Sequence, residues 1–414
     1  MVAIGNLAAP AAAFVSAPIL AHALGVDGRG EVAAGTAMLL LGTAIGTLGI
    51  SDAATYFVAS RTASPGAVLK RGTWYLAGSG LLLTVLSGIL APVLAAHDPE
   101  LTNVIRIAGL AITPTLMLGA LRGVAQGMQQ WALVNAEKYL TAVFRVVPLL
   151  VLLVLDALTP LTAVVVLAGA PIIGGLAYFR LLMPPRLRGF PLEERPPLIR
   201  YGLHVWIGSL SGIVLSRVDQ TLMTPLAGVY ELGLYAVAVN LADLLLIGQS
   251  ALGQVLFSVD AGERKNERLY LGARLSVAVS AVLALGLGIP AVFWVRMLFG
   301  PEFEPAVLAV WILLLAHVIG AAGSVAGVAT SARGRPALRS TAIAVAALVN
   351  LALLVALVPT LGAIGAAVAT LCGSGVGTVL NLYFARRSFG MSVTAFCFPR
   401  PSDVGSLLRI LRRR

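Results

Sequence analysis

The stretch that decides the fold runs from residue 306 to residue 330 and reads AVLAVWILLLAHVIGAAGSVAGVAT. It contains no Asp, Glu, Lys or Arg over 25 consecutive positions. A helix needs about 20 apolar residues to cross a hydrocarbon core that is roughly 30 Å thick. This stretch therefore predicts a helix that spans a membrane.

Similar apolar runs recur along all 414 residues of the chain. The chain is 58% hydrophobic and only 11% charged, whereas about a quarter of the residues of a soluble chain are charged. These numbers predict an all-α polytopic membrane protein. Reading the runs against polar breaks gives twelve spans, at about 2–24, 32–60, 72–96, 103–127, 136–155, 160–182, 199–227, 232–258, 269–299, 306–330, 336–357 and 363–385.

The net charge of +11 is distributed very unevenly over the connections between these spans. With the N-terminus in the cytoplasm, the cytoplasmic segments hold 23 of the 29 Lys and Arg. The opposite connections hold only Arg29 and Arg296, beside eight acidic residues. Because Lys and Arg collect on the cytoplasmic side, we expect both termini in the cytoplasm and the chain in the plasma membrane. The positive charge is then explained by the orientation of the spans in the membrane. We therefore expect no nucleic-acid partner.

A proline-rich connection at 183–198 divides the predicted spans into two sets of six. We therefore expect an N-lobe at 1–182, a cytoplasmic linker at 183–198, a C-lobe at 199–385 and a basic cytoplasmic tail at 386–414. The tail ends in LLRILRRR. This pattern fits either a short basic helix on the anionic leaflet or a disordered segment.

Two short stretches six spans apart resemble each other. Residues 23–33 read ALGVDGRGEVA and residues 226–236 read LAGVYELGLYA, so both end one span at a Gly-Val turn and begin the next. Both lobes enter this motif from the same side of the membrane. The repeat is therefore parallel, which predicts lobes related by a pseudo-two-fold axis along the membrane normal, with a cavity between them.

Charged residues inside the predicted spans are the candidate site residues, because ionisable groups at bilayer depth are costly. Arg145 lies well inside the fifth span, and Asp52 lies at a comparable depth in the second. Arginine is permanently charged and binds phosphate oxygens through two parallel hydrogen bonds. Arg145 therefore either lines a substrate cavity or forms a structural ion pair with Asp52, which is otherwise a candidate for ion coupling.

The seventh and eighth spans carry the other candidates. At about 100° per residue, Ser211 and Asp219 share one polar face of the seventh span. Arg217 is about 200° from Asp219 around the helix axis, so the two do not pair along it. Asn240 and Asp243 share a face of the eighth span. We expect Arg217, Asp219, Ser211 and Asn240 to bind substrate, and Asp243 to couple an ion or to fix the bundle.

Several kinds of chemistry are missing from the sequence. No phosphate-binding Gly-x-x-x-x-Gly-Lys-Ser/Thr loop occurs, and no His, Cys or carboxylate cluster has metal-ligand spacing. The predicted outer loops are too short to build a glycan-processing site. We therefore expect no cofactor, no metal and no enzymatic activity.

Taken in order, several motifs resemble one family of transporters. Residues 21–31 (AHALGVDGRGE), 48–57, 218–235 and 350–386 together are similar to lipid-linked oligosaccharide flippases of the Wzx type. These are polysaccharide biosynthesis proteins of the multidrug/oligosaccharidyl-lipid/polysaccharide exporter superfamily. The family commonly has Arg where this chain has His22, which puts any role of that position in doubt.

The resemblance implies a flippase that moves a polyprenyl-diphosphate-linked oligosaccharide to the outer leaflet by alternating access. Its partners would be that glycan, the lipid bilayer, and a glycan polymerase and glycosyltransferases. Three alternatives remain: a cation-coupled multidrug exporter, a lipid II flippase and a non-transporting scaffold of a glycan-assembly complex. The first span contains no acidic residue, which counts against the multidrug exporter. The chain also lacks two further spans and the arginines that lipid II flippases usually have in their first two helices.

Overall fold

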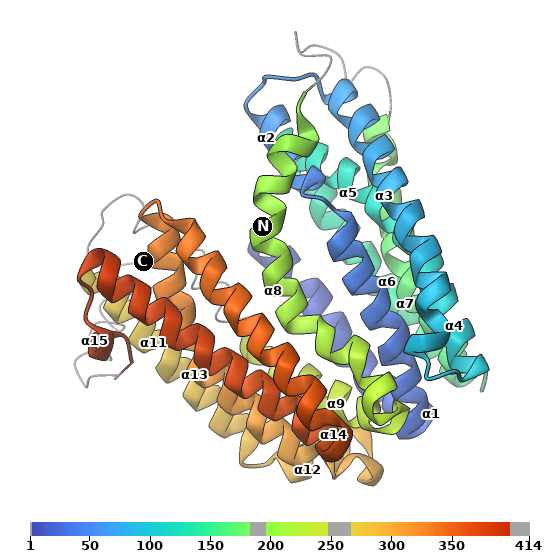
Figure 1. The fold of residues 1–414 in the computed structure, drawn as a ribbon. Coiled ribbons are helices and arrows are strands. Elements are labelled where there is room, and N and C mark those ends of the chain that lie inside the picture. Colours follow the sequence, from blue (N-terminus) through green and yellow to red (C-terminus); the bar gives the residue numbers. More distant parts are fainter. Residues whose placement is uncertain (1, 183–195, 247–265, 398–414) are drawn as a thin grey trace. The chain divides into compact units, whose positions relative to one another are not determined.

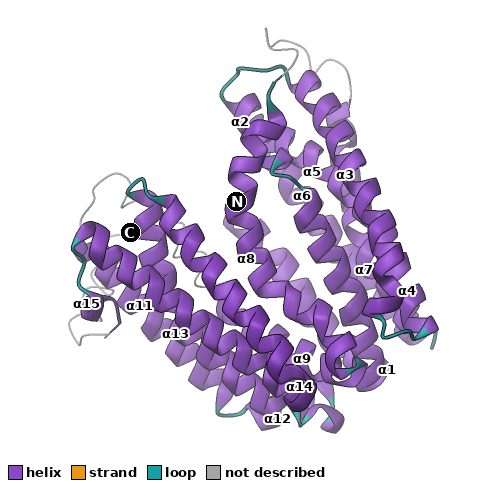
Figure 2. Cartoon of the chain, viewed as in Figure 1, coloured by secondary structure: helices purple, strands orange, loops and turns teal. Residues whose placement is uncertain are grey.

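The computed structural model describes residues 2–182, 196–246 and 266–397 (Figure 1). Every regular element in these ranges is a helix (Figure 2). The chain forms two compact units, which we call unit 1 (Met1–Ala236) and unit 2 (Val237–Arg414). The predicted all-α class is confirmed. Most of the predicted linker, the second half of the predicted eighth span and the end of the basic tail lie outside the described residues.

Unit 1 contains the helices up to the middle of α9. They are α1 (Val2–Gly46), α2 (Ile50–Ala59), α3 (Pro65–Leu94), α4 (Pro99–Leu110), α5 (Ile112–Gly127), α6 (Trp131–Val154), α7 (Pro160–Gly174), the 3-10 helix η1 (Gly175–Leu182), α8 (Leu198–Ala227) and α9 (Val229–Ala242). Because α8 packs against α1, α2 and α3, unit 1 extends past the predicted linker. The lobe boundary at 183–198 stays a prediction.

Unit 2 contains the rest of the chain. Its elements after α9 are α11 (Asn266–Gly288), α12 (Ala291–Phe299), the 3-10 helix η3 (Pro301–Phe303), α13 (Ala306–Ala332), α14 (Pro336–Phe389) and α15 (Val393–Cys397). The predicted ninth span, 269–299, is divided between α11 and α12 just before Pro290. Proline has no backbone N–H and cannot continue the helical hydrogen bonds.

Eight helical stretches among the described residues are long and apolar enough to cross a membrane. Many of their large side chains lie on the outside of the units: on α3, for example, Leu82 is 68% exposed and Ile89 67% exposed. In lipid such faces are solvated by hydrocarbon, and a helix satisfies its own backbone hydrogen bonds. The protein is therefore a multi-pass membrane protein, as predicted.

Two of these stretches are pairs of helices that meet at a glycine. At 45 residues, α1 would be about 68 Å long if straight, more than twice the thickness of a hydrocarbon core. It is interrupted at Gly25, whose φ is 66° and ψ −168°. The 54-residue α14 is interrupted in the same way at Gly362, with φ 52°. Only glycine adopts such angles without strain, so each glycine marks the break expected between two spans.

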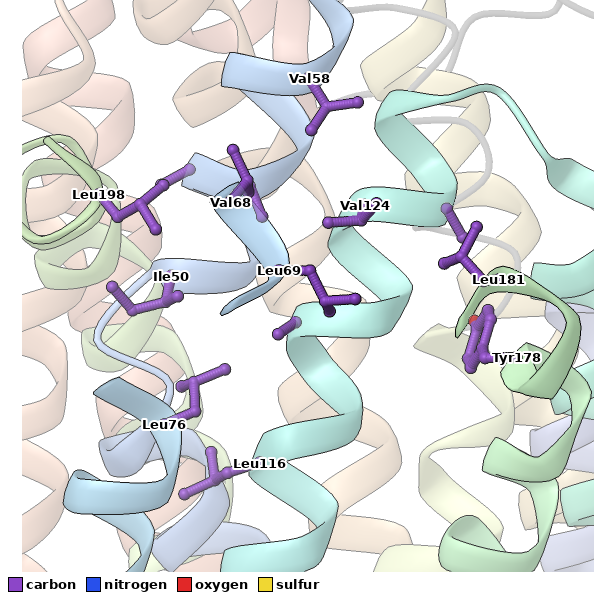
Figure 3. Close-up of a cluster of buried hydrophobic side chains, with 14 of the residues drawn as sticks. Ile50, Val58, Val68, Leu69, Leu76, Leu116, Val124, Tyr178, Leu181 and Leu198 are labelled. Carbon is purple, nitrogen blue, oxygen red and sulfur yellow. The ribbon is translucent and has the colours of Figure 1, made fainter. Parts of the chain in front are cut away.

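The core of unit 1 is built from aliphatic side chains of helices that are distant in sequence. Ile50 of α2, Leu76 of α3, Leu116 of α5 and Leu198 of α8 belong to one buried cluster and are at most 2% exposed (Figure 3). This cluster packs the beginning of α8 onto the helices that precede it by more than 70 residues. It therefore explains why α8 belongs to unit 1.

A polar network around the buried Glu137 joins α5, α6 and η1. Arg122 Nε donates to Glu137 Oε2 at 3.0 Å, and a second bond joins its Nη2 to Oε1. Tyr178 Oη also donates to Glu137 Oε2, at 2.6 Å. Glu137 is 2% exposed. The carboxylate is thus neutralised by a fork of two hydrogen bonds, the geometry in which Arg–carboxylate pairs are strongest.

The two similar sequence stretches meet inside unit 1. A Cβ placed on Gly30 would fall on the carbonyl oxygen of Val229, and a Cβ placed on Gly233 would fall on that of Val26. Gly30 and Gly233 occupy equivalent positions of the repeat, as do Val26 and Val229. The contact is therefore reciprocal, as expected for two segments related by a local two-fold axis.

We expect Gly30→Ala and Gly233→Ala each to destabilise the protein by about 1–3 kcal/mol, because the new methyl group overlaps a rigid backbone carbonyl. Thermal unfolding of the purified protein in detergent measures this effect. The matched control is Gly78→Ala in α3, where a Cβ would meet nothing within 4 Å. Alanine there should be neutral or stabilising by up to about 1 kcal/mol. Equal melting temperatures for all three variants would contradict the close crossing.

We expect Glu137→Ala to cost about 1–3 kcal/mol, because it removes the acceptor of three hydrogen bonds. We expect a value in the lower part of this range. The Arg122 side chain is 42% exposed, so without Glu137 its guanidinium can form hydrogen bonds with water. Tyr178→Phe should cost about 1 kcal/mol, and its effect should nearly vanish in the Glu137→Ala background. Additive losses in the double variant would show that Tyr178 does not act through this carboxylate.

Candidate functional site

Arg145 in α6 contacts the first part of α1. Its Nε donates to Ser16 Oγ at 3.0 Å, and the Ser16 hydroxyl donates in turn to the carbonyl of Ala13 at 3.1 Å. Ser16 is fully buried, whereas Arg145 is half-buried. Among the described residues no ion pair joins Arg145 to Asp52, which lies exposed in the first turn of α2. Arg145 therefore keeps its terminal nitrogens for another partner.

Arg29 is the main residue that the sequence alone does not reveal. From the loop pattern it is expected in an outer connection, yet its side chain is only 7% exposed. Its Nε is buried and has no acceptor among the described residues. The flanking glycines Gly28 and Gly30 are the available signal, because residues without Cβ let neighbouring segments approach and cover the side chain between them.

Asp219 lies at the contact between α8 and α9. It is 3% exposed, and its Oδ2 accepts a hydrogen bond of 2.5 Å from the hydroxyl of Tyr235, which is fully buried. The backbone N–H of Gln220 donates to Oδ1 at 2.7 Å. Arg217 is half-buried one half-turn earlier, and the side chain of Ser211 lies outside the described residues. These bonds give Asp219 a clear role in joining α8 to α9.

Asn240 and Asp243 lie in unit 2, and both are half-buried. Asp243 Oδ1 is 3.9 Å from His317 Nε2 on α13. No group of three His, Cys, Asp or Glu side chains in the described ranges could hold a metal ion. The pair is a polar contact between α13 and the end of α9.

The predicted site residues are thus divided between the two units. Unit 1 holds Arg145, Arg217, Asp219, Ser211 and Asp52, whereas unit 2 holds Asn240 and Asp243. Within unit 1 the structure brings Arg145 to Ser16, and Asp219 to Tyr235. Asp52 does not join either group. A cavity that combines residues of both units stays a prediction.

Unit 2 also has an apolar groove of about 520 Å³ between α11 and α13. Small residues of α11, among them Ala284 and Gly288, line one side, and Trp311 and Leu315 of α13 line the other. Trp311 Nε1 donates to the carbonyl of Gly288 at 2.7 Å, which satisfies the indole. The lining carries no charged side chain, so the groove offers contacts only to hydrocarbon.

Comparison with known proteins identifies the family. The family model described as "Polysaccharide biosynthesis protein" matches residues 1–259, well over half of the chain. A protein of Haloferax volcanii named "Probable low-salt glycan biosynthesis flippase Agl15" is 25% identical over 196 residues, which is 45% of this chain and 41% of that protein. The matching region therefore spans less than half the length of this curated relative.

Solved structures identify the fold. The structure entitled "Lipid II flippase MurJ, inward closed conformation" gives a TM-score of 0.71 at 12% identity, covering 95% of this chain and 89% of that one. An inward-facing multidrug resistance MATE family transporter of the MOP superfamily gives 0.69 at 14% identity, covering 95% and 98%. The chain shares the fold of these two proteins, and the family match confirms the resemblance noted in the sequence. The chain belongs to the polysaccharide biosynthesis protein family.

Proposed function

We propose that this transporter is a flippase that moves a polyprenyl-diphosphate-linked oligosaccharide from the cytoplasmic to the outer leaflet of the plasma membrane, for assembly of surface polysaccharide. The observation that carries the proposal is the family match over residues 1–259. The relative named as a glycan biosynthesis flippase supports it. Its partners are then the lipid-linked glycan, the bilayer, and the glycosyltransferases and polymerase that make and use that glycan.

The proposed mechanism is alternating access by two lobes of six spans each, 1–182 and 199–385, joined by the linker 183–198. Both termini lie in the cytoplasm, with the basic tail at 386–414. Parallel repeats of this kind move as nearly rigid bodies about a central substrate site. The reciprocal contact of Gly30 and Gly233 supports the repeat on which this mechanism depends.

The charges of the candidate residues suit a substrate with a diphosphate group. Arg145 and Arg217 supply permanent positive charge, which a diphosphate needs in a low-dielectric path. Ser211 and Asn240 offer neutral hydrogen bonds to sugar hydroxyls. Asp52 and Asp243 are the candidates for ion coupling, and the proximity of His317 supports Asp243 in that role.

The direct test uses the purified protein in proteoliposomes with a fluorescent polyprenyl-diphosphate oligosaccharide, and measures the fraction of label that a membrane-impermeant quencher reaches. We expect wild-type protein to speed equilibration between leaflets. Arg217→Gln should slow it about tenfold or more, because a charged hydrogen bond is worth about 1.5–3 kcal/mol. Arg106→Gln is the matched control, since Arg106 is exposed on α4. A wild-type protein that moves no lipid-linked sugar would overturn the proposal.

Cells lacking the gene separate the alternatives. A flippase predicts loss of surface polysaccharide that wild-type protein restores and Arg217→Gln restores poorly. Altered drug susceptibility with normal polysaccharide would identify a cation-coupled multidrug exporter, and lysis on depletion would identify a lipid II flippase. Deletion of a scaffold would also abolish surface polysaccharide. In that case the Arg217→Gln variant and the Arg145→Gln variant would each restore the polysaccharide fully.

Variants of Asp219 and Tyr235 test whether Asp219 binds the glycan or only joins α8 to α9. If its carboxylate mainly joins α8 to α9, Tyr235→Phe and Asp219→Asn should both lower the melting temperature, and Tyr235→Phe should cost about 1 kcal/mol. If it also contacts the glycan, only Asp219→Asn should reduce transport at a temperature where both variants are folded. Equal transport by the two variants would leave Asp219 with the structural role alone.

A further inference from the structure

Two tyrosines from distant segments of unit 1 stack face to face. The rings of Tyr56 on α2 and Tyr201 on α8 have centroids 4.5 Å apart and planes inclined by 14°. Phe57 packs edge-to-face against both, with its centroid 5.3 Å from that of Tyr56 and 5.7 Å from that of Tyr201. Phe57 is buried, whereas Tyr56 is 47% exposed. The stack therefore holds the Tyr56 ring in one orientation and leaves part of it uncovered.

A close crossing of helices brings the two rings together. A Cβ placed on Gly49, just before α2, would fall on the carbonyl oxygen of Gly202, and a Cβ placed on Gly202 would fall on that of Leu48. Glycine at both positions lets the two backbones touch. Trp206 Nε1 also donates to the carbonyl of Ala44 at 3.1 Å, which joins α8 to the end of α1. The orientation of the tyrosines is thus fixed by contacts between helices.

Asp52 lies on the same face of α2 as Tyr56, because residues four apart are neighbours on a helix surface. Another face of α2 holds Ile50 and Val58, which belong to the buried core of unit 1 (Figure 3). Asp52 is exposed, and no described residue forms a hydrogen bond or ion pair with its carboxylate. Carboxylates inside a membrane span face water or a polar partner rather than hydrocarbon. The exposed face of α2 is therefore a wet surface, and Tyr56 is not an aromatic anchor in lipid.

An aromatic face beside a carboxylate suits a sugar ring. The polarised C–H groups on one side of a pyranose pack against the electron-rich face of an aromatic ring. A carboxylate accepts hydrogen bonds from the sugar hydroxyls at the edge of that ring. The hydroxyls of Tyr56 and Tyr201 form no hydrogen bond among the described residues, whereas that of Tyr75 accepts one from Arg71 at 2.8 Å. Both hydroxyls are therefore available to a glycan.

The geometry of the stack favours a sugar over an organic cation. Sites for quaternary ammonium groups enclose the cation with several aromatic faces. Here Tyr201 covers one face of Tyr56, and the two rings are within 14° of parallel. They form one flat surface rather than a cage, and a flat surface fits the flat side of a pyranose.

We propose that Asp52, Tyr56 and Tyr201 form a binding site for a sugar ring of the transported oligosaccharide, with Tyr201 positioning Tyr56. We call these three residues the tyrosine platform. In the predicted topology the start of α8 and the end of α2 lie on the cytoplasmic side, so the platform meets the glycan before its transfer. That the sugar belongs to a lipid-linked glycan rests on the proposed function.

The first arm of the test measures binding of the glycan alone to the full-length protein, in a detergent without a sugar headgroup. The probe is the oligosaccharide released by mild acid from the lipid-linked fraction of host membranes, which carries neither lipid nor diphosphate. We expect the melting temperature of wild-type protein to rise with its concentration. Tyr56→Ala and Asp52→Ala should each raise the half-maximal concentration about three- to tenfold.

Tyr139→Ala is the matched control, because Tyr139 on α6 is 44% exposed and lies in none of the ring contacts of the described residues. It should leave the half-maximal concentration unchanged, and Tyr56→Phe, which keeps the ring, should raise it less than Tyr56→Ala. Because half-maximal concentrations are compared, a variant that melts earlier without ligand is still informative.

Two results of this arm would overturn the platform. One is a wild-type melting temperature that does not respond to the oligosaccharide, or a half-maximal concentration that Tyr56→Ala leaves unchanged. The other is a response to tetramethylammonium chloride that Tyr56→Ala abolishes, without any response to the oligosaccharide. The second result would identify a site for cations.

The second arm uses the leaflet assay described above and separates the platform from the flippase proposal. Tyr56→Ala should raise the half-saturating concentration of the glycan-bearing lipid about three- to tenfold, and Tyr139→Ala should not change it. If the oligosaccharide binds through Tyr56 but wild-type protein moves no lipid-linked sugar, the platform stands and the flippase proposal fails. If wild type and Tyr56→Ala move the lipid with equal half-saturating concentrations, the flippase stands and the platform fails.

Discussion

The hydrocarbon core of the bilayer is the constraint on which the rest of this structure depends. It provides no hydrogen-bond partner for a peptide group, so each crossing segment must be a helix that satisfies its own backbone. The same constraint lets large apolar side chains such as Leu82 and Ile89 lie on the outside of the bundle. Burial of apolar surface between two helices stabilises little in lipid. The helices are therefore held together by close packing and by the few polar contacts between them.

Close packing is most evident where the two similar stretches of the chain meet. Gly30 lies against the carbonyl of Val229, and Gly233 against that of Val26. Each stretch also turns at an equivalent glycine, Gly25 or Gly228, both with positive φ. One sequence pattern thus supplies both the break between spans and the crossing of the two copies.

The arginines of unit 1 differ in whether an acidic residue neutralises them. Arg122 is neutralised by Glu137, and Tyr178 completes that network, so the three residues join α5, α6 and η1. Among the described residues Arg29 and Arg145 have no such acid, and Ser16 accepts a bond from Arg145. The first group stabilises the unit on its own.

The sequence by itself determined the class of the protein, because composition and apolar runs such as 306–330 decide the solvent, and helices in that solvent follow from backbone chemistry. It also determined the family, and it placed the break in the first helical segment close to Gly25. Only the tertiary structure decided which charges are paired. Arg29 reads as a loop cation, and Arg145 as a possible partner of Asp52, because burial and pairing depend on segments far apart in the chain. The glycines beside Arg29 let those segments close over it, and no count of charges along the sequence contains that information.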